Sequence, residues 1–415
     1  MVNKKAGGIS IALQQEWLYY DPFQKPRSKH TEEGTITPDK HPHQKSGAYI
    51  FRPNGTDANL ITPKTIPYSV VIGNVTKEVR QTICSWISQT IRLVADQEYV
   101  EIEYSIAAIP VSDRGKEVIT RFTTSLKSQL EWYTDSNGRE MMYRKKNFRP
   151  SWPLQIMEWV SGNYYPVNAF AYIRDRKLQF TVLTDRSQGC SSLRVGELEF
   201  MVHRRLLMDD GRGVGEPLNE TAGITQYPQP VRLGVGMPIT GSHRLVLERI
   251  AHAMAVVRPL AKRVYAPLNL AFAPLKVGGQ STVQQWLSAH VAQASEMAAP
   301  LPVNVDILTL QIWPDDGTRI IRMEHQFAVG EDKVLARPVQ VQMSTLFSRF
   351  NITDIVELSL TANQPLRNVA HYQWSTEDDP QPLREARQGT SLWNVTLAPM
   401  QIRTFQISTS SLTPT

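Results

Sequence analysis

The chain has 415 residues, of which 41% are hydrophobic and 20% are charged, which is typical of a globular protein with two or three domains. Its apolar runs are too short to cross a bilayer, and the first ten residues lack the apolar core of a signal peptide. The formal net charge is +6, but the basic residues are scattered and accompany no recognition motif, which argues against a nucleic-acid partner.

The N-terminal part of the chain contains a long loop followed by a succession of strands. Residues 21–45 are rich in proline and charged residues, which predicts a surface loop. Short segments of alternating polarity follow, and those at 99–106 and 178–184 are typical of strands. The dipeptide Asn137-Gly138 lies between two further strand-like segments and predicts a tight turn.

Residues 186–220 combine a strand pattern with a charged loop. Leu198, Phe200 and Val202 alternate with polar residues, which is the period of a half-buried strand. Residues 209–213 (DDGRG) then predict a tight loop. A guanidinium between flexible glycines is suited to recognise a group that is rich in oxygen atoms.

Helical patterns are few, and strands return in the last third of the chain. A helix is predicted over 281–297 with Ser281 as its N-cap, whereas 242–256 fits a helix or a strand. Residues 298–303 resemble a domain edge. Further strands are predicted at 305–313, 319–327, 338–343, 355–362 and 400–407.

These patterns predict a mainly β protein with few short helices. We expect a large β super-sandwich over residues 1–297 and a smaller C-terminal β-sandwich over 298–407. The polar tail at 408–415 is predicted to be disordered.

The residues that could carry chemistry do not form an evident reaction centre. No histidine has the spacing of a zinc motif, and the pair His41 and His43 around a proline is more often without a metal. Asp209 and Asp210 are adjacent, so they point to opposite sides of an extended chain and do not form the carboxylate pair of a glycosidase.

Cysteines and glycosylation sequons bear on the cellular compartment. Cys84 and Cys190 could form one disulfide, but nothing in their spacing requires it. Sequons are more frequent than chance predicts, which favours passage through a secretory pathway. The candidate N-glycosylation sites are Asn54, Asn74, Asn219, Asn351 and Asn394.

Several long motifs occur in a fixed order along the chain. They include SGAYIFRPN, WYTDSNGRE, SGNYYPVNAFAYIRD and EHQFAVGED, together with the stretch from 184 to 220 and the closing run LAPMQIRTFQI at 397–407. In this combination the chain resembles the C-terminal half of the lysosomal-type α-mannosidases of glycoside hydrolase family 38. Cys190 departs from the pattern, since the resembling enzymes usually have glycine there.

The resemblance implies a zinc-dependent, retaining exo-mannosidase that acts on mannose-containing glycans in the lysosome, vacuole or secretory pathway. In this family the zinc ligands, the nucleophile and the general acid belong to an N-terminal catalytic domain, and no segment of this chain resembles it. We therefore expect a chain that binds no zinc itself, is inactive alone and works with the N-terminal catalytic half.

Two residues match family positions that reach the active site from the β region. The resemblance implies that Tyr49 and Arg212 bind substrate, whereas Asp135, Tyr165 and Asp210 are expected to be structural. A phenol and a guanidinium both suit sugar hydroxyls. The competing interpretation is that Tyr49 packs in the core and Arg212 pairs with a neighbouring aspartate.

A second hypothesis for the whole chain is a non-catalytic β-sandwich that binds carbohydrate or supports another protein. The missing carboxylate pair and zinc ligands motivate it. If the chain normally has a partner, its isolated form should expose apolar surface and aggregate.

Overall fold

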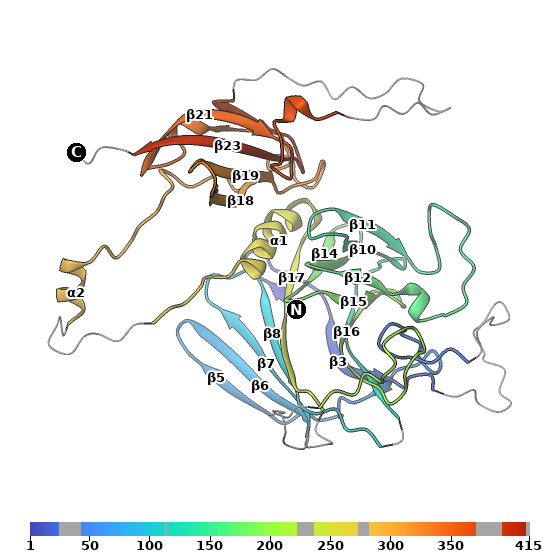
Figure 1. Ribbon diagram of the computed structural model, residues 1–415. Helices are drawn as coiled ribbons and strands as arrows, with labels where there is room; N and C mark the ends of the chain where they lie inside the picture. The colour runs from blue at the N-terminus through green and yellow to red at the C-terminus, as the bar shows by residue number, and fades with distance from the viewer. Residues whose placement is uncertain (25–42, 113, 222–235, 273–281, 371–391, 412–415) are drawn as a thin grey trace, which may run out of the picture. The chain divides into compact units, whose positions relative to one another are not determined.

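The computed structural model describes residues 1–24, 43–112, 114–221, 236–272, 282–370 and 392–411. The chain divides into two compact units, Met1–Tyr265 and Ala266–Thr415. Antiparallel strands dominate both units (Figure 1). This confirms the predicted mainly β fold. None of the helices in the described part is long and apolar enough to span a membrane.

The first unit contains two large antiparallel sheets. Its strands are β1 (Val2–Asn3), β2 (Ile9–Ser10), β3 (Leu13–Tyr20), β4 (Asn59–Leu60), β5 (Tyr68–Ile72), β6 (Thr76–Cys84), β7 (Ile87–Val94), β8 (Val100–Ile106), β9 (Lys116–Thr124), β10 (Glu131–Asp135), β11 (Met141–Lys145), β12 (Tyr165–Val167), β13 (Phe170–Arg174), β14 (Leu178–Thr184), β15 (Gln188–Ser191), β16 (Glu197–Arg205) and β17 (Ile239–Arg249). One sheet has the order β11-β10-β13-β14-β17-β8-β7-β6-β5, and the other has the order β12-β15-β16-β9-β3-β4. A 3₁₀ turn (η1, Ser161–Asn163) precedes β12.

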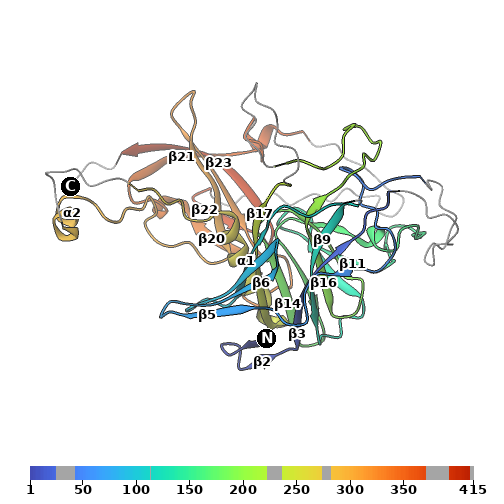
Figure 2. The same ribbon diagram turned by 90° about the horizontal axis from the view of Figure 1, so that it is seen from below.

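The two sheets pack face to face and enclose the main core (Figure 2). Phe122 of β9 and Phe200 of β16 meet Phe180 of β14 from the other sheet, and all three rings are fully buried. The ring centroids of Phe122 and Phe180 are 6.1 Å apart. Burial of each such ring stabilises the fold by about 2–3 kcal/mol. The predicted strand at Leu198 to Val202 is therefore confirmed, but it is not half-buried, because Glu199 on its expected polar face is buried as well.

The segment that fitted both a helix and a strand contains one of each. β17 ends at Arg249 and the helix α1 (Ile250–Tyr265) begins at the next residue. Within α1 the buried residues Ala253, Met254, Val257 and Ala261 follow helical spacing, and the helix packs on β14 and β17 (Figure 1). The spacing of the buried residues changes at this junction from that of a strand to that of a helix. Neither a helix nor a strand could therefore account for the whole of 242–256.

The second unit is a smaller sandwich. Its strands are β18 (Val305–Ile312), β19 (Arg319–His325), β20 (Val339–Gln342), β21 (Phe350–Leu358), β22 (Asn394–Leu397) and β23 (Ile402–Ser411). Its sheets have the orders β18-β19-β23-β21 and β20-β22, and short 3₁₀ turns lie at η2 (Met343–Thr345) and η3 (Leu366–Asn368). The core includes Met323, Phe405 and Leu397, which are fully buried.

The helix predicted over 281–297 is shorter than expected. α2 covers only Val283–Ala289, and none of its residues is buried. Its N-cap is Thr282, whose hydroxyl accepts from the N–H of Gln285 in a capping box, while Ser281 lies outside the described residues. Because no residue of α2 is buried, core packing does not stabilise further turns.

The division of the chain also differs from the prediction. The predicted boundary followed residue 297, but the N–H groups of Ala298 and Ser348 bond to the carbonyls of Leu346 and Glu296, so this segment contacts the second unit. Residues 408–411 continue β23 and pair with β21, and therefore are not part of a disordered tail. Pairing satisfies their backbone groups despite their polar side chains. Residues 412–415 and most of the predicted loop at 21–45 lie outside the described residues.

Most other predicted elements are present with small changes of boundary. The pattern at 99–106 corresponds to β8, where Ile102, Tyr104 and Ile106 are buried. The pattern at 178–184 coincides with β14. Gly138 has a φ of 80° in the turn between β10 and β11, which is the left-handed conformation that its position required.

Candidate functional site

Two motif loops that are far apart in the sequence lie against each other. We call residues 46–50 the SGAY loop and residues 209–213 the DDGRG loop. The carboxylate of Asp210 joins them: its Oδ2 accepts from the N–H of Tyr49 at 2.7 Å and from the following N–H at 3.0 Å. Its Oδ1 accepts from the N–H of Arg212 at 3.0 Å. One side chain therefore fixes the backbone beside both predicted substrate-binding residues.

Gln44 adds a second connection between the loops. Its side-chain amide donates to the carbonyl of Asp210 at 2.9 Å, and its Oε1 accepts from Nε of Arg212 at 2.8 Å and also from Nη2. The carbonyl of Gln44 accepts from Arg52, whose guanidinium pairs with Glu158 at 2.8 Å. A neutral amide thus orients the Arg212 guanidinium, and this contact does not neutralise the positive charge.

A buried ion pair supports the SGAY loop from below. Glu117 of β9 is fully buried and pairs with Arg204 of β16. Nη2 of Arg204 donates to the carbonyls of Gly47 at 2.8 Å and Ile50 at 2.9 Å, while the hydroxyl of Ser46 donates to Glu117. Both charges are therefore hydrogen-bonded, which a buried pair requires. The six-stranded sheet is in this way the platform for the loop.

Close approach of the two loops requires glycine at position 47. A Cβ atom there would lie 2.5 Å from Cβ of Asp210, which is well inside van der Waals contact. The carboxyl group of Asp210 is buried, which raises its pKa, but the N–H bonds from Tyr49, Arg212 and Ile50 and the charge of Arg204 outweigh burial. The pKa of Asp210 is therefore below its ordinary value, and the carboxylate is anionic at neutral pH.

Both predicted substrate-binding side chains are at the surface. Tyr49 is 65% exposed, so the interpretation that it packs in the core is wrong. Arg212 is exposed, and its side chain bonds to Gln44; it is the backbone N–H of Arg212 that bonds to Asp210. The Tyr49 ring passes within 3.9 Å of the Cβ position of Gly213. The two loops thus carry an exposed phenol and an exposed guanidinium, and both groups can bind oxygen atoms of a ligand.

A buried carboxylate that the sequence did not reveal ties several motifs together. Glu199 of β16 is 2% exposed and accepts from the hydroxyls of Tyr20 at 2.9 Å and Tyr164 at 2.6 Å. Arg121 of β9 pairs with the same carboxylate at 2.7 Å. Burial, followed by the nearby Glu199 charge, raises the pKa of both tyrosines, so they remain protonated donors. The signal that could have identified it is the register between β9 and β16, which is not visible in a single sequence.

Asp135 and Tyr165 are buried and contact other groups of the fold, which is consistent with the predicted structural role. Asp135 is fully buried and accepts from the N–H groups of Asn168 at 2.9 Å, Ala169 at 2.9 Å and Gly138 at 2.7 Å. Tyr165 lies between the guanidinium groups of two arginines, at 4.1 and 4.4 Å from its ring centroid. Neither residue is presented to a ligand in this arrangement.

The cysteines and the sequons have different environments. Cys84 and Cys190 are both free, and burial raises the pKa of the Cys190 thiol, so it is an inert packing residue. The sequon asparagines Asn74, Asn351 and Asn394 are exposed, whereas Asn54 and Asn219 are partly buried. The first three remain the most accessible candidates for glycosylation. His41 lies outside the described residues.

Comparison with known proteins agrees with the order of motifs. Residues 13–212 match the glycosyl hydrolases family 38 C-terminal domain, and residues 304–405 match the family 38 C-terminal beta sandwich domain. The chain is 44% identical to lysosomal alpha-mannosidase of Bos taurus over 369 residues, which cover 88% of the chain and 35% of that protein. It is 37% identical to alpha-mannosidase of Canavalia ensiformis over 413 residues, which cover 98% of the chain and 39% of that protein.

A solved structure shares the fold. An alpha-mannosidase from Enterococcus faecalis V583 has a TM-score of 0.51 and 11% identity, over 87% of this chain and 37% of that chain. The chain thus spans little more than a third of the length of the relatives it matches. The two matched domains and the identity to α-mannosidases lead to one assignment: the chain belongs to glycoside hydrolase family 38 and is the C-terminal region of an enzyme of that family.

Proposed function

We propose that this chain is the C-terminal region of an α-mannosidase that removes terminal α-linked mannose from glycans, and that its SGAY and DDGRG loops form one wall of the active site. The observation that carries the proposal is the shared carboxylate of Asp210, which holds Tyr49 and Arg212 next to each other. The relatives that match most of this chain are named α-mannosidases.

The two exposed side chains have complementary roles in this proposal. The Tyr49 hydroxyl donates to one sugar oxygen and its ring covers an apolar face of the sugar. Arg212 donates to further sugar oxygens with the guanidinium nitrogen that Gln44 does not engage. Because Gln44 and Asp210 fix both loops before substrate arrives, little conformational freedom is lost on binding.

The chemistry itself needs groups that these residues do not supply. A retaining glycosidase uses two carboxyl groups on opposite sides of the glycosidic bond. Both oxygens of Asp210 already accept N–H bonds, and within the described ranges no three His, Cys, Asp or Glu side chains gather to hold a metal. These residues do not fit a zinc site. We therefore assign zinc, nucleophile and general acid to the remainder of the enzyme.

The cellular setting follows from the relatives and the sequons. Relatives from Bos taurus and Dictyostelium discoideum are named lysosomal. Exposed sequon asparagines in the second unit, Asn351 and Asn394, are accessible to a glycosylating enzyme. We therefore propose a lysosomal or vacuolar enzyme that is glycosylated on its way there.

The test is a kinetic comparison in a reconstituted enzyme. The chain is co-expressed with the N-terminal part of the Canavalia ensiformis relative, and hydrolysis of a p-nitrophenyl α-mannoside is measured for Tyr49→Phe and Arg212→Lys. We expect kcat/KM to fall about tenfold or more for each, because each loses a hydrogen bond to a sugar oxygen. Tyr143→Phe, which alters an exposed tyrosine outside both loops, is the control and should keep full activity. Unchanged kcat/KM in both loop variants contradicts the proposed wall.

A further inference from the structure

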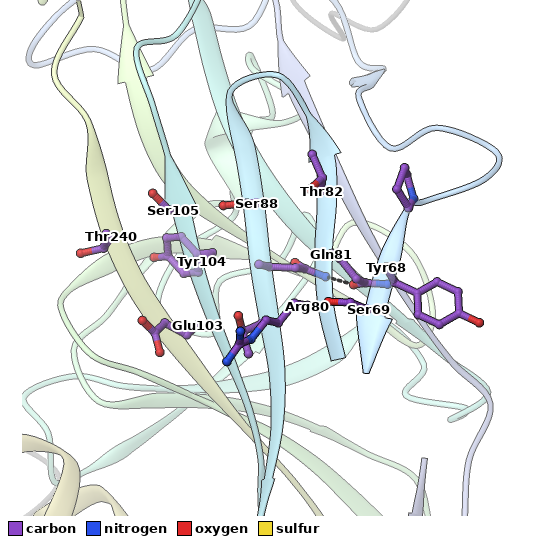
Figure 3. A pocket seen from close by; sticks show the side chains of 13 residues that line it. Tyr68, Ser69, Arg80, Gln81, Thr82, Ser88, Glu103, Tyr104, Ser105 and Thr240 are labelled. Carbon is purple, nitrogen blue, oxygen red and sulfur yellow. Dashed lines mark hydrogen bonds between the residues drawn. The ribbon is translucent and has the colours of Figure 1, made fainter. Parts of the chain in front are cut away.

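A polar concavity lies on the nine-stranded sheet, and none of its residues belongs to the SGAY loop or the DDGRG loop. It has a volume of about 550 Å³ and is formed mainly by β5, β6, β7 and β8, with Thr240 of β17 at its border (Figure 3). The residues that alternate with its side chains along β8, Tyr104 and Ile106, are buried in the core. Its own side chains, such as Glu103 and Ser105, therefore project from the opposite face of the sheet. We call this concavity the hydroxyl groove.

Small hydroxyl side chains cross the groove in a straight row. Thr82 of β6 is paired with Ser88 of β7, which is paired with Ser105 of β8, which is paired with Thr240 of β17. Figure 3 shows the four residues in succession across the strands. Since neighbouring strands are about 4.8 Å apart, the row extends for about 14 Å. A row of this length can contact more than one residue of a chain-like ligand.

The hydroxyls of the row are available to a ligand. Among the residues that the structure describes, none of these four side chains forms a hydrogen bond to another protein group. Each hydroxyl can donate one hydrogen bond and accept others. Thr82, Ser88 and Thr240 are exposed and Ser105 is half-buried. The groove thus presents one hydroxyl group on each of four neighbouring strands, and each hydroxyl can both donate and accept.

The charged residues beside the row balance each other. Arg80 pairs with Glu78 at 2.8 Å. Arg92 pairs with Glu78 and Glu101 at 2.8 Å and with Glu103 at 3.0 Å. Arg244 of β17 completes the network through Glu101 at 2.7 Å. Three guanidinium groups face three carboxylates, so the surface has no net charge to attract a phosphate, a sulfate or a nucleic acid.

We propose that the hydroxyl groove binds a neutral oligosaccharide. Sugar hydroxyls donate and accept in the same way as the row does, and a neutral ligand matches the balanced charges. A peptide that adds to a sheet edge would pair with β5 at the border of the groove and not with the hydroxyl row, because the backbones of β6, β7 and β8 are paired on both sides. The chemical class of the ligand is inferred from the groove alone. Only the choice of a mannose oligosaccharide as the probe rests on the proposed function.

Binding of an α-linked mannopentaose to the purified 415-residue chain tests this proposal. Titration calorimetry should give saturable binding, and the double variant Thr82→Val/Thr240→Val should weaken it about tenfold or more, because two hydroxyls are lost. Valine has the shape and strand preference of threonine, so the sheet is preserved. Thr76→Val changes the same residue type in β6, outside the groove, and should bind as the unmodified chain does.

Three results would overturn the proposal. They are absence of saturable binding, undiminished binding by the double variant, and tighter binding of a sulfated heparin oligosaccharide than of mannopentaose. If the double variant unfolds, Ser105→Ala, which removes only a half-buried hydroxyl, replaces it with the same expectation. Binding that is weakened by Arg212→Ala but not by the groove variants also contradicts the assignment. The outcome is independent of catalysis, since failure of the loop variants to alter kcat/KM leaves groove binding intact.

Discussion

At the scale of single residues, the candidate site depends on side chains that contact backbone more than on side chains that contact ligand. Asp210 and Gln44 together hold the loops that carry Tyr49 and Arg212. An aspartate is suited to this role because it offers acceptors only, and all the groups that it contacts are N–H donors. Its motif neighbours are therefore oriented by a residue that we do not expect to touch the sugar.

Replacement of this carboxylate should loosen both loops. In Asp210→Asn the amide nitrogen would face N–H donors on one side, so we expect the free energy of unfolding to fall by about 1–3 kcal/mol in urea denaturation. The pKa of Asp210 is lowered in the folded chain, so this difference should be full at neutral pH and disappear as pH falls through that lowered pKa. Asp57→Asn removes an exposed carboxylate and should cost little. If Asp210→Asn and Asp57→Asn have the same free energy of unfolding, Asp210 does not hold the two loops together.

A buried histidine should make stability depend on pH. Burial lowers the pKa of His243 to about 4, while its ring Nε2 donates to Oε1 of Gln188 at 2.8 Å. In the unfolded chain this histidine takes up a proton near pH 6.5, whereas in the folded chain it stays neutral down to about pH 4. The free energy of unfolding should therefore fall by about 2 kcal/mol between pH 6.5 and pH 5. His243→Gln should show a flatter decline over this range by denaturant titration. An identical decline in both proteins would mean that other groups are responsible.

The motifs singled out two residues that are exposed in the structure, but they did not show how the loops that carry them are assembled. Tyr49 and Arg212 were identified by the motifs around them, both are exposed, and Asp210 bonds to the backbone N–H of each. The bond between Asp210 and Tyr49 joins residues that are 161 positions apart. The burial of Glu199 depends on the register of β16 against β9, which places it opposite Arg121. Periodicity reports only local structure, so it assigned Glu199 to the polar face of its strand.

At the scale of elements, local patterns were reliable where one period persists and failed where it changes. The segment 242–256 was ambiguous because it contains the end of β17 and the start of α1. The helix at 281–297 was overestimated because good helix formers continue beyond Ala289, whereas no residue of α2 is buried and packing does not extend the helix. Both differences have the same cause: tertiary packing decides where an element ends.

The edge strand β5 should govern how the isolated chain behaves. Its backbone is paired on one side only, and Tyr68, Val70 and Ile72 are all more than half exposed. Unprotected apolar edges pair with other chains. We expect the isolated chain to self-associate, and Ile72→Lys to shift it toward the monomer in sedimentation velocity.

A matched control separates the edge from general surface charge. Val329→Lys introduces the same side chain at an exposed aliphatic residue in a turn of the second unit. It should leave self-association as it is, because no strand edge is altered. If both variants reduce association to the same extent, net charge and not β5 is the cause.

At the scale of the whole molecule, the chain is two β units that together match the C-terminal region of a longer enzyme. The family resemblance indicated this arrangement more directly than composition did, because a β-sandwich supports many functions.

The most direct measurement of the central claim is the α-mannosidase activity of the chain, with zinc supplied, alone and after co-expression with the N-terminal part of a family 38 relative. We predict no activity above background for the chain alone and zinc-dependent hydrolysis by the complex, which Arg212→Ala should strongly reduce. Hydrolysis by the chain alone, or a complex indifferent to Arg212→Ala, would contradict the claim that this region lines an active site completed by the rest of the enzyme.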